Sequence, residues 1–132
     1  DVINVSGHRL STGEMEEVLS GHSAVAECAV IGVNDDLRGQ LPLGLVVLKA
    51  GESIAEETLV EELTAMVRDQ VGAVACFRQA LIVQRLPKTR SGKVLRAVLR
   101  KIAANESYTM PSTIDDPAIL TEIDQNLRSA GF

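Results

Sequence analysis

The sequence predicts a small α+β domain of the α/β type, in which helices flank a mixed sheet of about three strands plus a short N-terminal strand. Segments rich in β-branched and apolar residues alternate with segments of helical periodicity. Two Ser-x-x-Glu patterns of the capping-box kind stand where two helical segments begin. The 132 residues are 45% apolar but only 2% aromatic, which suits one aliphatic core. We therefore expect a single domain over residues 1–132.

The first helix is predicted from a capping box, with Ser11 as N-cap and Glu14 three residues later. Before it, residues 2–5 form an extended segment that a turn at residues 6–7 closes. Apolar side chains on one face indicate that the helix packs on the sheet, and Gly21 marks its end.

Two strands are predicted next, over residues 24–33 and 41–49, because both segments are apolar and rich in β-branched side chains. The polar residues 34–40 join them as a loop. Pro42 lacks a backbone N–H and therefore indicates an edge strand or the beginning of a strand.

A second capping box, Ser53 with Glu56, predicts a longer helix that ends before Gly72. Residues 80–86 are predicted as a third strand, and residues 94–104 as a helix with one apolar face. The polar residues that follow are expected to be irregular. A last helix then begins, with Asp116 as N-cap and Pro117 as its first residue.

The third predicted strand leads into a basic loop, Pro87-Lys88-Thr89-Arg90-Ser91-Gly92-Lys93. Its small and polar residues favour a tight turn. A lysine on a mobile loop that contains glycine can meet an anionic oxygen as a compact point charge. The loop is equally compatible with an ordinary solvated turn on a surface helix.

The net charge of −5 argues against nucleic acid as a partner. Seven of the 13 Lys and Arg residues nevertheless fall within residues 85–101, which contain no acid. Such a basic span suits a phosphate-bearing small molecule or an acidic partner surface.

Cys28 and Cys76 lack the CxxC spacing, and His8 and His22 do not cluster with them, so we expect free thiols and no metal site. No apolar run approaches the ~20 residues that span a bilayer, which argues against a membrane partner. The chain opens without Met or a signal peptide and is expected to be a domain of a longer protein, cytoplasmic or in the mitochondrial matrix.

Two segments resemble the adenylate-forming enzymes, which include acyl-CoA synthetases, peptide-synthetase adenylation domains and luciferases. Residues 87–93 resemble their C-terminal signature, and Asp1-Val2-Ile3-Asn4-Val5-Ser6-Gly7-His8-Arg9 resembles the start of their small C-terminal domain. The resemblance spans essentially the whole chain and is closest to acetyl- and propionyl-CoA synthetases. Residues 110–117 resemble part of a C-terminal extension of those enzymes, and in this chain we expect the extension to span residues 105–132. Residues 72–78 resemble the propionyl type.

The resemblance implies the mobile C-terminal domain of a two-domain acid–thiol ligase. In such an enzyme a short-chain carboxylate, acetate or propionate, attacks the α-phosphate of ATP, and coenzyme A then displaces AMP from the acyl-adenylate. A large N-terminal domain, the expected partner within the same chain, holds most of the ATP, its Mg²⁺ and the acyl group. The small domain presents a different face to each half of the reaction, and alone is expected to be inactive.

For this chain the resemblance implies that Lys93 is the catalytic lysine, a cation between carboxylate and phosphate. Because the loop is basic and accessible, Lys93 is also expected to be a substrate for a lysine acetyltransferase and deacetylase. Two other interpretations stay open: a stand-alone module that binds a nucleotide or an acidic partner, and an adenylation domain of another adenylate-forming enzyme.

The residues implied to bind coenzyme A lie elsewhere in the sequence. Ser6, Gly7 and His8 match the segment along the pantetheine arm, and Arg9 matches an arginine associated with nucleotide phosphate. His8 has no carboxylate nearby in sequence and is not expected to act as a general base. Arg68 either contacts the nucleotide end of coenzyme A or stabilises the C-terminal end of its helix through the helix dipole.

Overall fold

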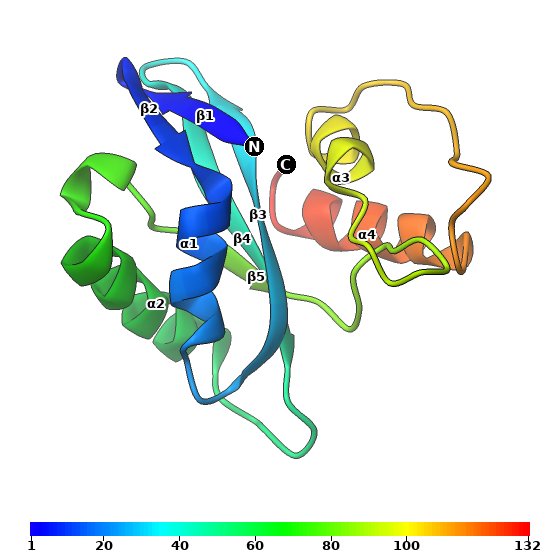
Figure 1. The fold of residues 1–132 in the computed structure, drawn as a ribbon, viewed down its shortest axis with the longest axis horizontal. Helices are drawn as coiled ribbons and strands as arrows, with labels where there is room; N and C mark the ends of the chain where they lie inside the picture. The colour runs from blue at the N-terminus through cyan, green and yellow to red at the C-terminus, as the bar shows by residue number, and fades with distance from the viewer.

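The computed structural model describes residues 1–132 and contains a five-stranded mixed sheet with helices on both faces (Figure 1), as the predicted α+β class requires. The strands are β1 (Val2–Val5), β2 (His8–Ser11), β3 (Val25–Asp35), β4 (Gly39–Leu48) and β5 (Ala80–Ile82). The helices are α1 (Thr12–Ser20), α2 (Glu56–Gln70), α3 (Arg96–Ala103) and α4 (Ala118–Ser129), with a 3₁₀ turn at Ala73–Ala75.

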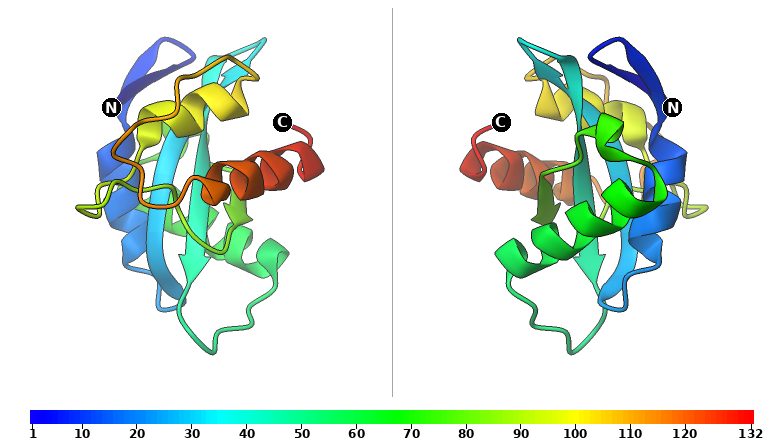
Figure 2. Two further views of the ribbon diagram at one scale, coloured as in Figure 1. Left: turned by 90° about the vertical axis from the view of Figure 1, so that its right-hand side faces the viewer. Right: turned by 90° about the vertical axis from the view of Figure 1, so that its left-hand side faces the viewer.

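The sheet is the middle layer of three. Helices α1 and α2 cover one face, and α3 and α4 cover the other, together with the loop that leads to α3 (Figures 1 and 2). Residues 41–46 of β4 are all buried, because β4 is central and both faces of the sheet are covered. The 31 side chains of the hydrophobic core are aliphatic except for Phe77 and Met15, in line with the low aromatic content.

The strand order is β2-β1-β4-β3, and β5 pairs in parallel with β4. Of the two positions that Pro42 indicated, the edge strand is wrong, whereas a place near the beginning of a strand fits, because Pro42 is the fourth residue of β4. On the side of β4 away from β3, β1 pairs only at Gly39 and β5 begins at Gly44. Pro42 lies in the gap between these two pairings, where a central strand can do without an N–H donor on that side.

The N-terminal segment forms a hairpin, of which only the first strand was predicted. Val5 pairs with His8 across a two-residue turn. Ser6 and Gly7 have φ values of 51° and 83°, the positive values that a type I′ hairpin turn requires. The Ser6 N–H donates to the Arg38 carbonyl at 2.8 Å, which ties the hairpin tip to the turn between β3 and β4.

Of the two predicted capping boxes, the first is confirmed at its N-cap, since the Ser11 hydroxyl accepts the Glu14 N–H at 3.2 Å. The second is wrong: α2 begins after Ala55 and has no side-chain cap. Glu56 instead reaches across to β5, where its carboxylate accepts the Ile82 N–H at 3.0 Å. A sequence spacing cannot distinguish these two uses of a glutamate.

The remaining strands and helices were predicted correctly in kind and less accurately in length. The third strand is three residues long rather than seven, because the chain leaves β4 after Ile82. Helix α4 begins one residue later than predicted, yet Asp116 still accepts the Ala118 N–H at 3.0 Å. Both cysteines are free and half-buried. None of the helices combines the length and apolar character needed to cross a membrane.

Candidate functional site

The basic loop is a hydrogen-bonded turn. Lys88 and Val94 form an isolated antiparallel bridge at its base. The Thr89 N–H donates to the Lys93 carbonyl at 2.8 Å, and the Gly92 N–H donates to the Thr89 carbonyl at 2.9 Å. The Thr89 hydroxyl accepts the Lys93 N–H at 3.1 Å. These bonds fix the backbone of Lys93 at the end of the turn, just before α3.

The side chain of Lys93 is exposed and forms no ion pair. It borders a hollow of about 440 Å³ between the beginning of α1 and the beginning of α3. The other residues that line this hollow are Asp1, Thr12, Gly13, Glu16, Val94, Leu95, Arg96, Ala97 and Arg100. The lysine is therefore presented to the outside beside a concave surface.

Four of the seven cations of the basic span already form ion pairs, so less charge is available to a phosphate or to an acidic partner surface than the sequence alone indicates. The four paired cations contact acids from distant parts of the chain: Arg85 with Asp116 and Glu122, Lys88 with Glu27, Arg96 with Glu16, and Arg100 with Asp1. Only Arg90, Lys93 and Lys101 of the span form no ion pair. Of these three, Arg90 and Lys93 lie on the loop.

The ion pair between Arg96 and Glu16 crosses the edge of the sheet. The guanidinium donates to both carboxylate oxygens, at 2.9 and 2.5 Å. The same carboxylate accepts the Val30 N–H of β3 at 2.8 Å, and β3 is an edge strand. The hydrogen bond with Glu16 raises the pKa of Arg96. Helix α3, which follows Lys93, is thus fastened to both α1 and β3.

Cys28 lies beside this cluster, and its thiol donates to the Glu16 carbonyl at 3.4 Å. Burial raises the pKa of the Cys28 thiol. A raised pKa keeps sulfur protonated, whereas nucleophilic cysteines have a lowered one. Cys28 is therefore a packing residue.

No group of three His, Cys, Asp or Glu side chains lies where it could hold a metal ion.

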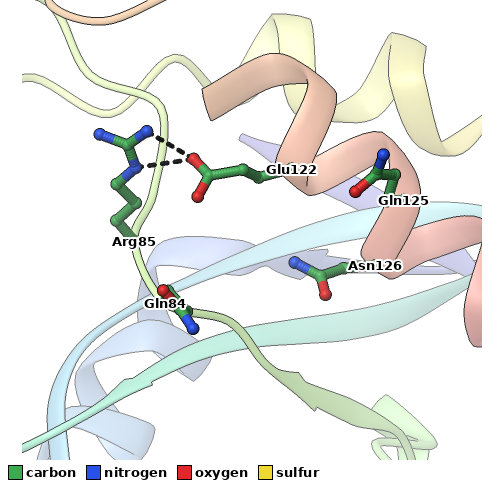
Figure 3. Close-up of a pocket in the computed structure, with 5 residues that line it drawn as sticks. All are labelled: Gln84, Arg85, Glu122, Gln125 and Asn126. Carbon is green, nitrogen blue, oxygen red and sulfur yellow. Dashed lines mark hydrogen bonds and ion pairs between the residues drawn. The ribbon is translucent and has the colours of Figure 1, made fainter. Parts of the chain in front are cut away.

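Arg85 lines a second hollow, of about 200 Å³, between the segment after β5 and α4, and all five lining residues are polar (Figure 3). Its Nε and Nη2 atoms donate to Glu122 at 2.8 and 2.5 Å, and its Nη1 atom donates to Asp116 at 2.7 Å. The hydrogen bond from Arg85, followed by that from the Ala118 N–H, holds the pKa of Asp116 below its ordinary value of 3.8. Arg85 therefore serves as an anchor for α4.

We expect the Asp116 carboxyl to titrate below pH 3.8 in an NMR titration. Because this pKa is lowered in the folded state, the ion pair stabilises the folded state fully above pH 3.8. That stabilisation is lost as the pH falls through the lowered pKa. Arg85→Met should move the Asp116 midpoint back toward 3.8. A midpoint that this substitution leaves unchanged would contradict the anchoring role of Arg85.

The residues expected to bind coenzyme A lie mainly at the hairpin tip. Ser6, Gly7, His8 and Arg9 are all exposed. A Cβ atom added to Gly7 would have no atom within 4 Å, so the space beyond the turn is open. His8 makes no hydrogen bond to a carboxylate, whereas the other histidine, His22, contacts Glu62 at 2.6 Å.

Arg68 lies in the last turn of α2 and is exposed, a position that suits stabilisation of the helix dipole. In Figure 1 the hairpin of β1 and β2 and the C-terminal end of α2 lie on the left of the view, and the loop 87–93 lies on the right. The structure therefore does not bring Lys93 together with the other predicted site residues. Sequence reasoning missed Glu16 and Glu27, because they lie 80 and 61 residues from their basic partners.

Comparisons with known proteins identify the family. Residues 14–93 match the model of the AMP-binding enzyme C-terminal domain. An uncharacterized protein of Pseudomonas aeruginosa is 69% identical over 97% of this chain and 20% of that protein. Acyl-CoA synthetase short-chain family member B, mitochondrial, of Dictyostelium discoideum is 56% identical over 94% of this chain and 18% of that protein.

A solved structure agrees with these matches. The crystal structure of Brucella canis acyl-CoA synthetase superposes with a TM-score of 0.72 and 42% identity, over 76% of this chain and 18% of that one. The chain thus spans about a fifth of the length of these relatives. With more than half of its residues matched by the family model, the chain belongs to the AMP-binding enzyme C-terminal domain family.

Proposed function

We propose that the chain is the C-terminal domain of a short-chain acyl-CoA synthetase, which converts acetate or propionate, ATP and coenzyme A into acyl-CoA, AMP and pyrophosphate. The observation that carries this proposal is the isolation of Lys93. It is exposed beside a hollow, on a fixed turn, while four of the other six cations in the span are neutralised. Similarity to relatives with acyl-CoA synthetase names supports the assignment.

In the first half-reaction a carboxylate approaches the α-phosphate of ATP, and both groups are anionic. An ammonium group between them lowers their repulsion and orients the attack. Lys93 supplies this charge when the domain turns the loop 87–93 toward the N-terminal adenylation domain. The Thr89 hydroxyl accepts the Lys93 N–H and so holds the backbone from which the ammonium group extends.

In the second half-reaction the hairpin tip lines the path of coenzyme A. Gly7 leaves open space beyond the turn, as close passage of a pantetheine arm requires. Ser6 and His8 flank that passage, and Arg9 and Arg68 offer guanidinium groups to phosphates. Because the hairpin tip and the loop 87–93 are separate parts of the domain surface, we expect the domain to take a different orientation in each half-reaction.

The proposed partners follow from this division of labour. The N-terminal domain of the same protein binds the carboxylate and ATP with its Mg²⁺. A lysine acetyltransferase and a deacetylase act on the exposed Lys93 and switch its charge. The enzyme works in the cytoplasm or the mitochondrial matrix, and the name of the Dictyostelium relative describes that protein as mitochondrial.

Acyl-CoA formation by the chain alone tests the proposal. The chain 1–132 should fold, because it contains a continuous core of 31 buried residues. It should form no acyl-CoA from acetate or propionate, ATP and coenzyme A, whereas the full-length protein should. Turnover by the chain alone would contradict the proposal, and so would a full-length protein that makes adenylates but no coenzyme A thioester.

A further inference from the structure

The C-terminal part of the chain pairs with the basic loop through an isolated bridge and two backbone hydrogen bonds. Thr89 and Ile114 form an isolated antiparallel bridge. The Arg90 N–H donates to the Thr113 carbonyl at 3.0 Å, and the Asp115 N–H donates to the Lys88 carbonyl at 2.9 Å. Residues 113–115 therefore pair with residues 88–90 on one side of the turn, while Val94 pairs with Lys88 on the other.

The paired segment, residues 113–115, is itself fixed in place. Ile114 is 4% exposed and belongs to the hydrophobic core. Asp116, two residues later, receives a hydrogen bond from Arg85, which also holds Glu122 on α4 (Figure 3). The segment is thus held by a buried side chain at its centre and by an ion-pair anchor directly after it.

The turn needs such support. A two-stranded ribbon alone is marginally stable in water, and a third strand or packing against other elements is required for a stable arrangement. The loop between residues 88 and 94 contains Gly92 with a φ of 91°, and nothing lies within 4 Å of a Cβ built there. The bonds from residues 113–115 therefore restrain residues 88–90 in addition to the hydrogen bonds within the turn.

We propose that residues 113–115 are a positioning element for Lys93, a role that rests on the proposed function of that lysine in adenylation. Residues 113–115 lie beyond the part of the chain that the family model matches, which ends at residue 93. By holding residues 88–90, they fix the end of the turn at which Thr89 bonds both the N–H and the carbonyl of Lys93. The ammonium group then starts from one backbone position when the domain closes.

The test uses a pair of substitutions at Asp115. Asp115→Pro removes the N–H that donates to the Lys88 carbonyl, because proline has no backbone N–H. Asp115→Ala keeps that N–H and removes only an exposed carboxylate that makes no hydrogen bond or ion pair. The two variants therefore differ in the backbone hydrogen bond.

In the full-length protein, Asp115→Pro should lower pyrophosphate exchange roughly 10–100-fold relative to Asp115→Ala, since small misplacement of a catalytic group has effects of that order. Consumption of supplied acyl-adenylate with coenzyme A should be equal in the two variants, which general unfolding would not allow. Hydrogen exchange of the amides in residues 88–93, followed by mass spectrometry, should be faster in Asp115→Pro.

Lys93→Ala, measured in parallel, separates two kinds of failure. If Lys93→Ala leaves pyrophosphate exchange unchanged, the proposed function of the lysine is wrong, while faster amide exchange in Asp115→Pro would still support the restraint on the loop. If Lys93→Ala abolishes exchange but the two Asp115 variants match each other in both readouts, the positioning role of residues 113–115 is overturned.

Discussion

Replacing Lys93 with alanine in the full-length protein is expected to lower the rate of adenylate formation roughly 10²–10³-fold. The reason is the loss of the one ammonium group that the turn presents beside the hollow at α1 and α3. Loss of a well-placed charge contact in a transition state costs about 3–4 kcal/mol. Pyrophosphate exchange reports this half-reaction, and thioester formation from supplied acyl-adenylate should continue.

Lys101→Ala is the matched control, because Lys101 is also exposed, belongs to the same basic span and forms no ion pair. It should leave both half-reactions at the level of the unmodified protein. Protein acetylated at Lys93 should behave like Lys93→Ala and recover when the acetyl group is removed. Equal losses in both half-reactions would mean that Lys93 serves folding or domain docking instead.

The second large effect is expected from Gly7→Leu, which should block thioester formation and spare adenylation. In this chain the added side chain projects into open space, so it would meet only a molecule that comes to lie against the hairpin tip, which the proposed function identifies as the pantetheine arm. The positive φ of 83° adds a strain of about 1–2 kcal/mol, since residues with a Cβ tolerate this region poorly.

Gly51→Leu controls for that strain. Gly51 has a φ of 84°, a Cβ there would also meet nothing within 4 Å, and it lies in a turn after β4, away from the hairpin. If Gly51→Leu lowers thioester formation as far as Gly7→Leu, the effect is general destabilisation. A fall in pyrophosphate exchange equal to the overall loss in Gly7→Leu would contradict a role confined to coenzyme A.

Local chemistry made much of the fold predictable from the sequence. The N-cap at Ser11, the cap-like role of Asp116 and the turn at Ser6 and Gly7 each depend on residues within a few positions of one another. The predictions failed where a distant element decided the outcome. Ser53 does not cap α2, and Pro42 lies in a central strand, because the arrangement around β5 was not visible in either local pattern.

The candidate site shows the same limit more sharply. The sequence identified the loop 87–93 and its lysine, but its basic neighbours looked free, because no acid lies within residues 85–101. In the fold, Glu16 and Glu27 reach Arg96 and Lys88 across 80 and 61 residues of chain. Ion pairs of this kind depend on the packing of three layers, which a charge count along the chain cannot express.

The covering of β3 has a consequence for how the domain behaves when it is apart from other proteins. The unpaired N–H and C=O groups of an edge strand are a template on which a second molecule can add a strand. Here the Val30 N–H already donates to the Glu16 carboxylate, and Arg96 forms an ion pair with that carboxylate. Self-association through β3 would first require this ion pair to open, so the domain does not expose an aggregation-prone edge at that point.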